Sequence, residues 1–162
     1  EEKLKAELNQ TLAELDPSTD YRLRISIAKS GKVTCQREKL QALPETFCKA
    51  ILVPQNANLQ QPFTYFKTSY RPHLSLGQQE QIYYNAQGQL LESSIGNLVL
   101  QLDSHLYTPP VELGLLDGIY RQHLLATGQA TEKILSLDDL KSAEKIYACN
   151  ALRGLYELEI DD

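Results

Sequence analysis

A lysine stands inside an aromatic run near the middle of the chain, in the stretch FTYFKTSYRPHLSL at residues 63–76. Lys67 has four aromatic residues around it, and a second cation, Arg71, follows four positions later. An amine attacks a carbonyl compound only when it is neutral. Burial among apolar rings and a nearby positive charge both disfavour the ammonium form. The pattern therefore indicates a reactive amine, although a surface lysine whose stem covers apolar neighbours would show the same pattern.

The residues after this stretch form the elements that would have to position such an amine. QIYYNAQGQLLESSIGNLVLQLD predicts three strands with a turn at Gly88. A further short strand, a Pro-Pro break and a helix from about Gly118 to a C-terminal Gly128 follow. ATEKILS predicts a strand, Ser136 and Asp139 form a capping box for a short helix, and KIYACN and GLYELEI predict two more strands.

The first part of the chain has a simpler pattern. Leucines spaced by four, four and three residues predict an amphipathic helix over residues 2–15, ended by Asp16 and Pro17. A hairpin with its turn at Gly31 follows, and FCKAILVP predicts a strand ending at Pro54. These patterns predict an α+β fold in two regions, a small domain at 1–54 and a large one at 63–162, joined by a polar linker at 55–62.

Composition excludes several classes of protein. The 162 residues are 42% hydrophobic, carry a net charge of −5 and show no basic stripe, which argues against disorder and against nucleic-acid binding. The three cysteines and three histidines show no metal-ligand spacing, and no apolar run is long enough to span a membrane. The charged start is unlike a secretory signal, so we expect a reduced, cytoplasmic protein.

Four stretches together resemble one family: YFKTSYR, LLESSIGNLVL, TPPVELGLLDGIYR and CNALRG. In this order and at these spacings they are similar to the fold-type IV pyridoxal-phosphate enzymes, which include branched-chain and D-amino-acid aminotransferases and aminodeoxychorismate lyases. The resemblance covers about residues 63–160 and implies the D-amino-acid aminotransferase-like fold with pyridoxal 5′-phosphate as the cofactor. FKTSYRPHL and CNALRG are closer to the lyases, including those fused behind an aminodeoxychorismate synthase.

The resemblance implies a role for each motif. Lys67 would bond covalently to the cofactor aldehyde, and Glu92 would keep the pyridine nitrogen protonated, with Asn97 ordering the same strand region. The phosphate would be bound by amides at a helix start and by the CNALRG turn. The residues that this implies for the phosphate are Gly118, Ile119, Tyr120, Asn150 and Ala151. Read without the resemblance, Glu92 could equally be a surface residue at a strand start.

Two arginines are candidates for binding the substrate, and one residue departs from the family pattern. Arg71 and Arg153 are candidates to bind a substrate carboxylate, because guanidinium groups bind carboxylates through two hydrogen bonds. Ala151 stands where relatives often carry Ser or Thr, so only backbone amides remain for the phosphate there. His73 is interpreted as structural or solvent-facing, like the other histidines.

The resemblance implies an activity and leaves alternatives open. The favoured one is 4-amino-4-deoxychorismate lyase, which eliminates pyruvate and yields 4-aminobenzoate for folate biosynthesis. The first alternative is a class IV aminotransferase, a transferase acting on branched-chain or D-amino acids. The second is a non-catalytic remnant that keeps the fold for assembly with a partner.

The resemblance and the composition also predict a missing N-terminal segment and a second subunit. The sequence contains no methionine, and relatives carry a further N-terminal segment. We therefore expect a fragment in which the N-terminal part of the small domain is missing. Relatives usually form dimers, so a homodimer is expected.

Overall fold

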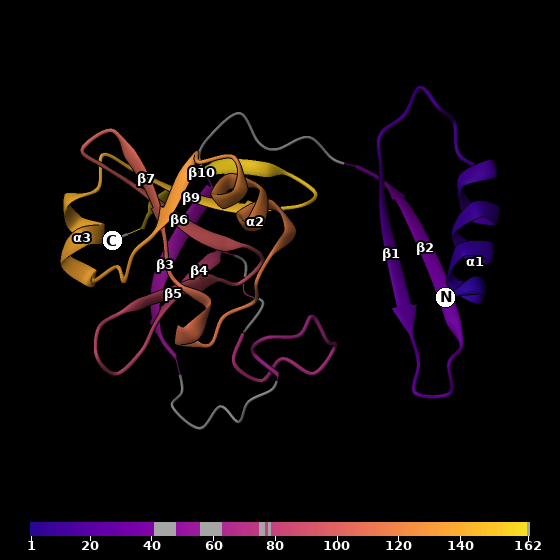
Figure 1. Cartoon of the computed structure of the whole chain (residues 1–162), viewed down its shortest axis with the longest axis horizontal. Coiled ribbons are helices and arrows are strands. Elements are labelled where there is room, and N and C mark those ends of the chain that lie inside the picture. The colour runs from indigo at the N-terminus through magenta and orange to yellow at the C-terminus, as the bar shows by residue number, and fades with distance from the viewer. Residues whose placement is uncertain (41–47, 56–62, 75–76, 78, 162) are drawn as a thin grey trace. The chain divides into compact units, whose positions relative to one another are not determined.

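The computed structural model describes residues 1–40, 48–55, 63–74, 77 and 79–161. The chain divides into two compact units, Glu1–Leu43 and Pro44–Asp162 (Figure 1). The predicted linker at 55–62 lies outside the described residues except for Gln55.

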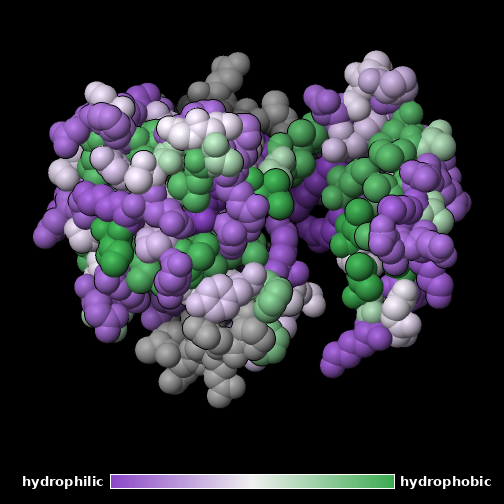
Figure 2. Space-filling model, viewed as in Figure 1, coloured by the Kyte–Doolittle hydropathy of each residue, from purple (hydrophilic) through white to green (hydrophobic). Residues whose placement is uncertain are grey.

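The first unit consists of one helix and one hairpin. The predicted elements are confirmed as α1 (Glu2–Ala13), β1 (Tyr21–Ile27) and β2 (Val33–Lys39). The two strands pair antiparallel, and the turn between them contains Gly31 at a positive φ of 79°. No described residue of this unit is fully buried, and Leu12, Ile25 and Ile27 are exposed. Figure 2 shows apolar residues at the surface of this unit. The helix therefore rests on a thin hydrophobic layer.

The second unit is built around one eight-stranded sheet in the order β5-β4-β3-β10-β9-β6-β7-β8. Every strand predicted in this part of the chain is confirmed. The strands are β3 (Cys48–Pro54), β4 (Glu80–Tyr84), β5 (Leu90–Ser93), β6 (Asn97–Leu102), β7 (His105–Thr108), β8 (Ala130–Glu132), β9 (Lys145–Asn150) and β10 (Gly154–Ile160). The sheet mixes parallel and antiparallel pairs, because β3 pairs parallel with both β4 and β10.

The boundary between the two units differs from the predicted one. We expected β3 to belong to the small domain, within residues 1–54, but β3 lies between β4 and β10 in the large sheet. The alternation of FCKAILVP predicts a strand but does not say which sheet it joins. Hydrogen bonds to two parallel neighbours settle that choice, and both neighbours come from later in the chain.

Six of the eight strands close into a ring, because β5 also pairs with β6. Where β5 and β6 pair, Glu92 lies opposite Asn97. On the other side of β5, Ile82 lies opposite Ser93 and Tyr84 opposite Leu90, so three steps on β5 match two on β4. Such a bulge reverses the alternation of side chains. It places Ser93 on the face of Ile82 and leaves Glu92 on the face of Asn97.

Helices and short turns cover the sheet. The 3-10 helix η1 (Val111–Leu113) and α2 (Ile119–Ala126) follow β7, and α3 (Leu137–Ser142) follows β8. The predicted capping box is confirmed, since Ser136 accepts from the Asp139 amide and Asp139 accepts from the Ser136 amide. A core lies between α2 and the sheet and contains Val99, Leu124, Ala130 and Cys149. The opposite sheet face buries Ala50, Ile82, Leu98 and Ala148.

Among the described residues, no helix has the length and apolar character of a membrane span.

Candidate active site

Glu92 is the residue on which the candidate site depends. Its side chain is 2% exposed, although it is a carboxylate on a strand. One oxygen, Oε2, accepts a long hydrogen bond of 3.4 Å from the Leu116 amide. The other, Oε1, is buried without a hydrogen-bond partner in the described part of the chain. Burial raises the pKa of Glu92 from 4.5 to about 7, against the opposing effects of Arg71, the Leu116 amide and Lys67.

A buried carboxylate oxygen without a donor is costly, so Oε1 is suited to accept a hydrogen bond from a bound group. A protonated ring nitrogen is a donor that would satisfy Oε1 and would favour the ionised carboxylate. The alternative interpretation of Glu92 as a surface residue is therefore wrong, because the side chain is buried, and the geometry is compatible with its expected role.

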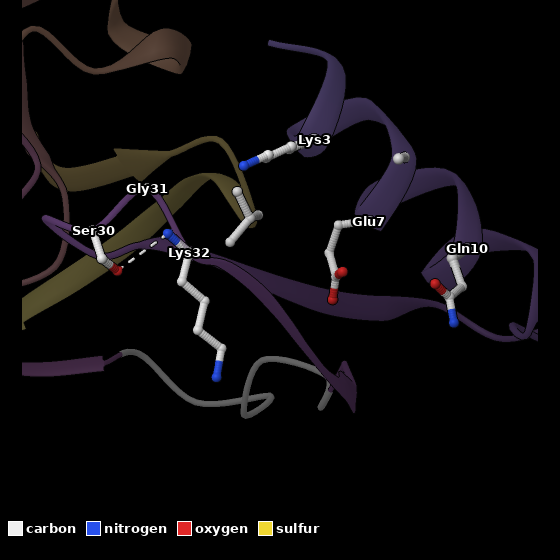
Figure 3. A pocket seen from close by; sticks show the side chains of 8 residues that line it. Lys3, Glu7, Gln10, Ser30, Gly31 and Lys32 are labelled. Atoms are coloured by element: carbon white, nitrogen blue, oxygen red, sulfur yellow. Dashed lines mark hydrogen bonds between the residues drawn. The ribbon is translucent and has the colours of Figure 1, made fainter.

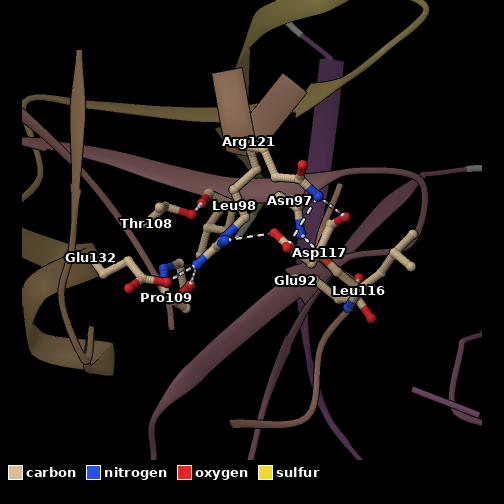
Figure 4. Close-up of polar contacts among 10 residues, drawn as sticks. Glu92, Asn97, Leu98, Thr108, Pro109, Leu116, Asp117, Arg121 and Glu132 are labelled. Carbon is tan, nitrogen blue, oxygen red and sulfur yellow. Dashed lines mark hydrogen bonds and ion pairs between the residues drawn. The ribbon is translucent and has the colours of Figure 1, made fainter. Parts of the chain in front are cut away.

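Asn97 connects Glu92 to the start of α2. The two residues lie opposite each other on β5 and β6, and Asn97 Nδ2 donates to the Leu116 carbonyl at 2.7 Å. The next contact is with Gly118, where an added Cβ would lie 2.2 Å from Asn97 Oδ1. Only glycine allows this approach, so the Gly in LLDGIYR is required by Asn97. Figure 4 shows Glu92, Asn97 and Leu116 grouped together.

We expect Gly118→Ala to weaken binding of pyridoxal phosphate by about 10- to 100-fold. The new methyl group would push Asn97 or the helix start apart, at the cost typical of overpacking a well-packed site. The measurement is a titration of the purified variant with the cofactor, followed by absorbance.

Gly77→Ala is the matched control, because its added Cβ would lie 3.2 Å from the end of the flexible Gln81 side chain and 3.5 Å, an ordinary contact distance, from the Gln79 carbonyl. A double variant, Gly118→Ala with Asn97→Ala, removes the clashing oxygen. Equal affinity of the wild type and Gly118→Ala would contradict the steric argument.

The predicted phosphate-binding segments lie next to each other. α2 begins after Gly118 with no side-chain cap, so its first amides are available to an anion. Gly154, which ends the β9–β10 turn, has a φ of 69°, and a Cβ there would lie 3.4 Å from the Tyr120 ring. The turn and the helix start are therefore in contact, which agrees with a shared phosphate site. Ile119 exposes its side chain at this place, so its amide rather than its side chain would serve.

The side chain of Asn150 forms hydrogen bonds within and beside the β9–β10 turn. Its Oδ1 accepts from the amides of Leu152 and Arg153, at 3.0 and 2.9 Å. Its Nδ2 donates to the Ile95 carbonyl at 3.3 Å and so holds the β5–β6 turn beside the β9–β10 turn. The side chain is thus engaged in shaping the turn. Ala151 is exposed at the tip of that turn.

The segment around Lys67 corrects one expectation. We expected the aromatic residues to bury the amine, but Lys67 is exposed, and Phe66 and Tyr70 are each 61% exposed. Phe63 and Tyr70 pack edge to face instead, with ring centroids 5.1 Å apart. Apolar rings in an irregular segment can stack on each other as easily as around a neighbour, and nothing in the local sequence decides between the two. The Lys67 charge still reaches Glu92 and lowers its pKa.

The two candidate substrate arginines separate in the structure. Arg71 lies near the candidate site, because its charge acts on both Glu92 and His73 and lowers the pKa of each. Arg153 lies over the Tyr156 ring, 5.9 Å from its centroid, and its charge acts on Glu80. Arg71 is thus the better placed of the two. His73 is buried, and burial is the main cause of its lowered pKa.

Sequence reasoning missed three residues that shape this site. Leu116 contributes its amide to Glu92 and its carbonyl to Asn97. Thr108 is fully buried and donates to the Leu98 carbonyl at 2.8 Å, which fixes the end of β7 against β6. Arg121 is 2% exposed and forms an ion pair with Asp117 at 2.8 Å. Of these three, only the Asp117–Arg121 pair could have been predicted from the sequence, because an Asp and an Arg four residues apart commonly pair at a helix start.

The first unit contains a hollow that is unrelated to these residues. It has a volume of about 490 Å³ and lies between α1 and the β1–β2 turn (Figure 3). The residues that line it are Lys3, Ala6, Glu7, Gln10, Ser30, Gly31, Lys32 and Val33. No predicted site residue is among them, so we place the candidate site in the second unit.

The family model of the class IV aminotransferases matches residues 1–158 of this chain. The chain belongs to the class IV aminotransferase family. The match extends the resemblance from the four motifs of the second unit to the helix and hairpin of the first. As a class IV aminotransferase, the chain has the fold expected from its motifs, and membership indicates an enzyme dependent on pyridoxal phosphate.

Individual relatives have names of two kinds. A Schizosaccharomyces pombe protein, provisionally named aminodeoxychorismate lyase, is 27% identical over 82% of this chain and 63% of its own length. A crystal structure of a provisionally named amino-acid aminotransferase from Mesorhizobium loti has a TM-score of 0.86 and 30% identity, covering 99% of this chain and 81% of that one. A provisionally named 4-amino-4-deoxychorismate lyase from Haemophilus somnus has a TM-score of 0.70 and 25% identity, covering 93% and 75%. The chain thus spans less than two thirds of its curated S. pombe relative.

The residues present fit this cofactor at both of its ends. At the ring end, Glu92 Oε1 is buried and lacks a donor in the described part of the chain. At the phosphate end, the uncapped start of α2 contacts the β9–β10 turn, and Gly118 leaves no side chain in the way. The carbonyl-reactive amine would come from Lys67.

Proposed function

We propose that this class IV aminotransferase is a 4-amino-4-deoxychorismate lyase that uses pyridoxal 5′-phosphate. The observation that carries the cofactor assignment is the buried, donor-free Oε1 of Glu92, with the charges of Arg71 and Lys67 acting on the same carboxylate. The lyase assignment is supported by the similarity of FKTSYRPHL and CNALRG to lyases of the family. The name of the S. pombe relative also supports it.

The charges near Glu92 suit a substrate that carries carboxylates. Aminodeoxychorismate has one carboxylate on its ring and one on its enolpyruvyl group. Arg71 is the guanidinium whose charge reaches Glu92, and it can bind one of them through two hydrogen bonds. Arg153 would contribute only if the β9–β10 turn moved it away from Tyr156, where it now lies.

The chain's own residues would divide the chemistry between them. When bound, the cofactor supplies an electron sink for the charge that develops on the substrate. Glu92 holds the proton on the ring nitrogen, and the amides of Ile119 and Tyr120 bind the phosphate. Lys67 removes the proton from the substrate carbon that bears the amino group. The C–O bond to the enolpyruvyl group breaks, the removed proton ends on pyruvate, and the ring becomes aromatic as 4-aminobenzoate.

The second candidate is an amino-acid aminotransferase of the same family, favoured by the name of the M. loti structure at 30% identity. It would use the same lysine to move a proton between two carbons. Such an enzyme needs a keto-acid acceptor to complete its cycle, whereas the lyase needs none.

The deciding experiment is a product assay. The protein is supplied with pyridoxal phosphate and aminodeoxychorismate without any keto acid, and pyruvate and 4-aminobenzoate are quantified. We expect equal amounts of the two products. If turnover depends strictly on an added keto acid, the lyase assignment is wrong and the aminotransferase assignment takes its place. A protein that never takes up the cofactor would exclude both and leave the non-catalytic remnant.

We further propose a homodimer in the cytoplasm as the working form of the protein. Light scattering on the eluting protein, with and without cofactor, measures its mass and would reject the dimer if only a monomer were present.

A further inference from the structure

Arg121 is a buried cation that has no role in the chemistry above. Its side chain is 2% exposed and ranks among the largest fully buried side chains of the described residues. The guanidinium Nη1 donates to Asp117 Oδ1 at 2.8 Å, and Nη2 donates to the Pro109 carbonyl at 3.0 Å. Nη2 also contacts the Glu132 carboxylate. Figure 4 shows the guanidinium between these three groups.

The partners of Arg121 come from separate elements. Asp117 precedes α2, Pro109 follows β7, and Glu132 ends β8. One guanidinium therefore ties the start of α2 to the two outer strands of the sheet. Both carboxylates remain partly exposed, at 48% and 44%, whereas the arginine between them is buried. Without the arginine, two like charges would remain close together and free to turn toward water.

The turn held by Arg121 is the turn that serves both ends of the candidate cofactor site. Leu116 gives its amide to Glu92 and its carbonyl to Asn97, which concerns the ring end. Gly118 packs against Asn97 and begins the helix whose amides face the phosphate. Asp117 lies between these two residues and binds Arg121. The turn is thus fixed by β5 and β6 on one side and by Arg121 on the other.

We propose that Arg121 is a positioning residue, which acts through Asp117 to hold the turn before α2, so that the first amides of that helix can bind the cofactor phosphate. This inference rests on the proposed cofactor function. Among the described residues, no hydrogen bond or ion pair joins Arg121 to Lys67 or Glu92, so its effect has to pass through the turn. Arginine suits the task, because its planar group can bind a carboxylate on one edge and further acceptors on another.

The test compares the binding of pyridoxal phosphate with that of pyridoxal, which lacks the phosphate. We expect Arg121→Met and Asp117→Asn each to lower the preference for the phosphorylated form about tenfold, because both variants release the helix start. Binding of pyridoxal itself should change little. Methionine keeps much of the apolar volume of arginine, and thermal unfolding without cofactor reports whether each variant folds.

Asp138→Asn is the matched control. Asp138 pairs with Lys141 at the start of α3, so this variant also removes an acid from a helical ion pair, away from the candidate site. It should leave the preference for pyridoxal phosphate unchanged.

The outcomes separate the two proposals. An unchanged preference in folded Arg121→Met and Asp117→Asn would overturn the positioning role and leave Arg121 as a purely structural ion pair. If Arg121→Met does not fold, the partly exposed Asp117 still gives the decisive variant. A wild-type protein that binds pyridoxal phosphate no better than pyridoxal would instead overturn the phosphate site of the proposed function.

Discussion

Replacement of Lys67 by alanine should lower turnover by roughly 10³- to 10⁴-fold. Lys67 is the proposed base, and its charge acts on Glu92 and lowers the pKa of that carboxyl group. Loss of its amine should also prevent covalent fixation of the cofactor. The measurements are steady-state formation of 4-aminobenzoate and mass spectrometry after borohydride reduction, which adds the cofactor mass only where an amine has bonded to it.

The control for Lys67→Ala is Lys141→Ala. Lys141 is also exposed, and it forms an ion pair with Asp138 on α3. This control should keep both turnover and borohydride labelling. Labelling of the Lys67→Ala protein at another lysine would show that the reactive amine has been assigned to the wrong residue.

A second large effect should follow from Glu92→Gln, and its sign depends on pH. Burial raises the pKa of Glu92 from 4.5 to about 7, so the folded chain without cofactor binds this proton more tightly than the unfolded chain. The corresponding stability is fully present below pH 4.5 and is lost as the pH rises through 7. The difference amounts to about 3 kcal/mol, at 1.36 kcal/mol for each unit of pKa.

Glutamine does not titrate, so Glu92→Gln lacks this pH-dependent loss. In the absence of cofactor, the variant should gain about 3 kcal/mol relative to the wild type between pH 4 and pH 8. Chemical denaturation at several pH values measures the difference. Parallel curves for the two proteins over this range would contradict the assignment of a buried, titrating Glu92.

The same substitution should harm the reaction while it helps the fold. A glutamine amide cannot hold a positive ring nitrogen as a carboxylate does, so kcat should fall by about 10²-fold. Stability gained and activity lost in one variant is the behaviour expected of a group kept in a costly environment for function. Gln81→Glu, a charge change on the neighbouring strand β4, serves as a comparison. We expect it not to combine a gain in stability with a loss of activity.

Much of this molecule was predictable from local patterns. The helix at the start, the hairpin at Gly31 and the capping box of Ser136 and Asp139 depend on residues within a few positions of each other. Alternating or periodic apolar residues bury one face of an element wherever that element lies. The motif residues Glu92 and Gly118 were found differently, through the resemblance to the family, and their close contacts with Leu116 and Asn97 appear only in the structure.

The parts that escaped prediction depend on contacts between distant segments. β3 was assigned to the wrong unit, because its sheet partners β4 and β10 come from later in the chain. Lys67 was expected to be buried, but its aromatic neighbours pack on each other instead. In the sequence Arg121 resembles an ordinary helix residue, whereas in the structure it also contacts Pro109 and Glu132.

The sequence by itself determined the elements, the family and the side chains able to do the chemistry, because propensity, periodicity and motif spacing are properties of neighbouring residues. Only the tertiary structure decided that the β5 bulge turns Glu92 toward Asn97, where the ring closes. It also decided that Leu116 joins both of them to the start of α2. The physical reason is that burial, which raises the pKa of Glu92, is produced by strands and loops that meet only when the sheet closes.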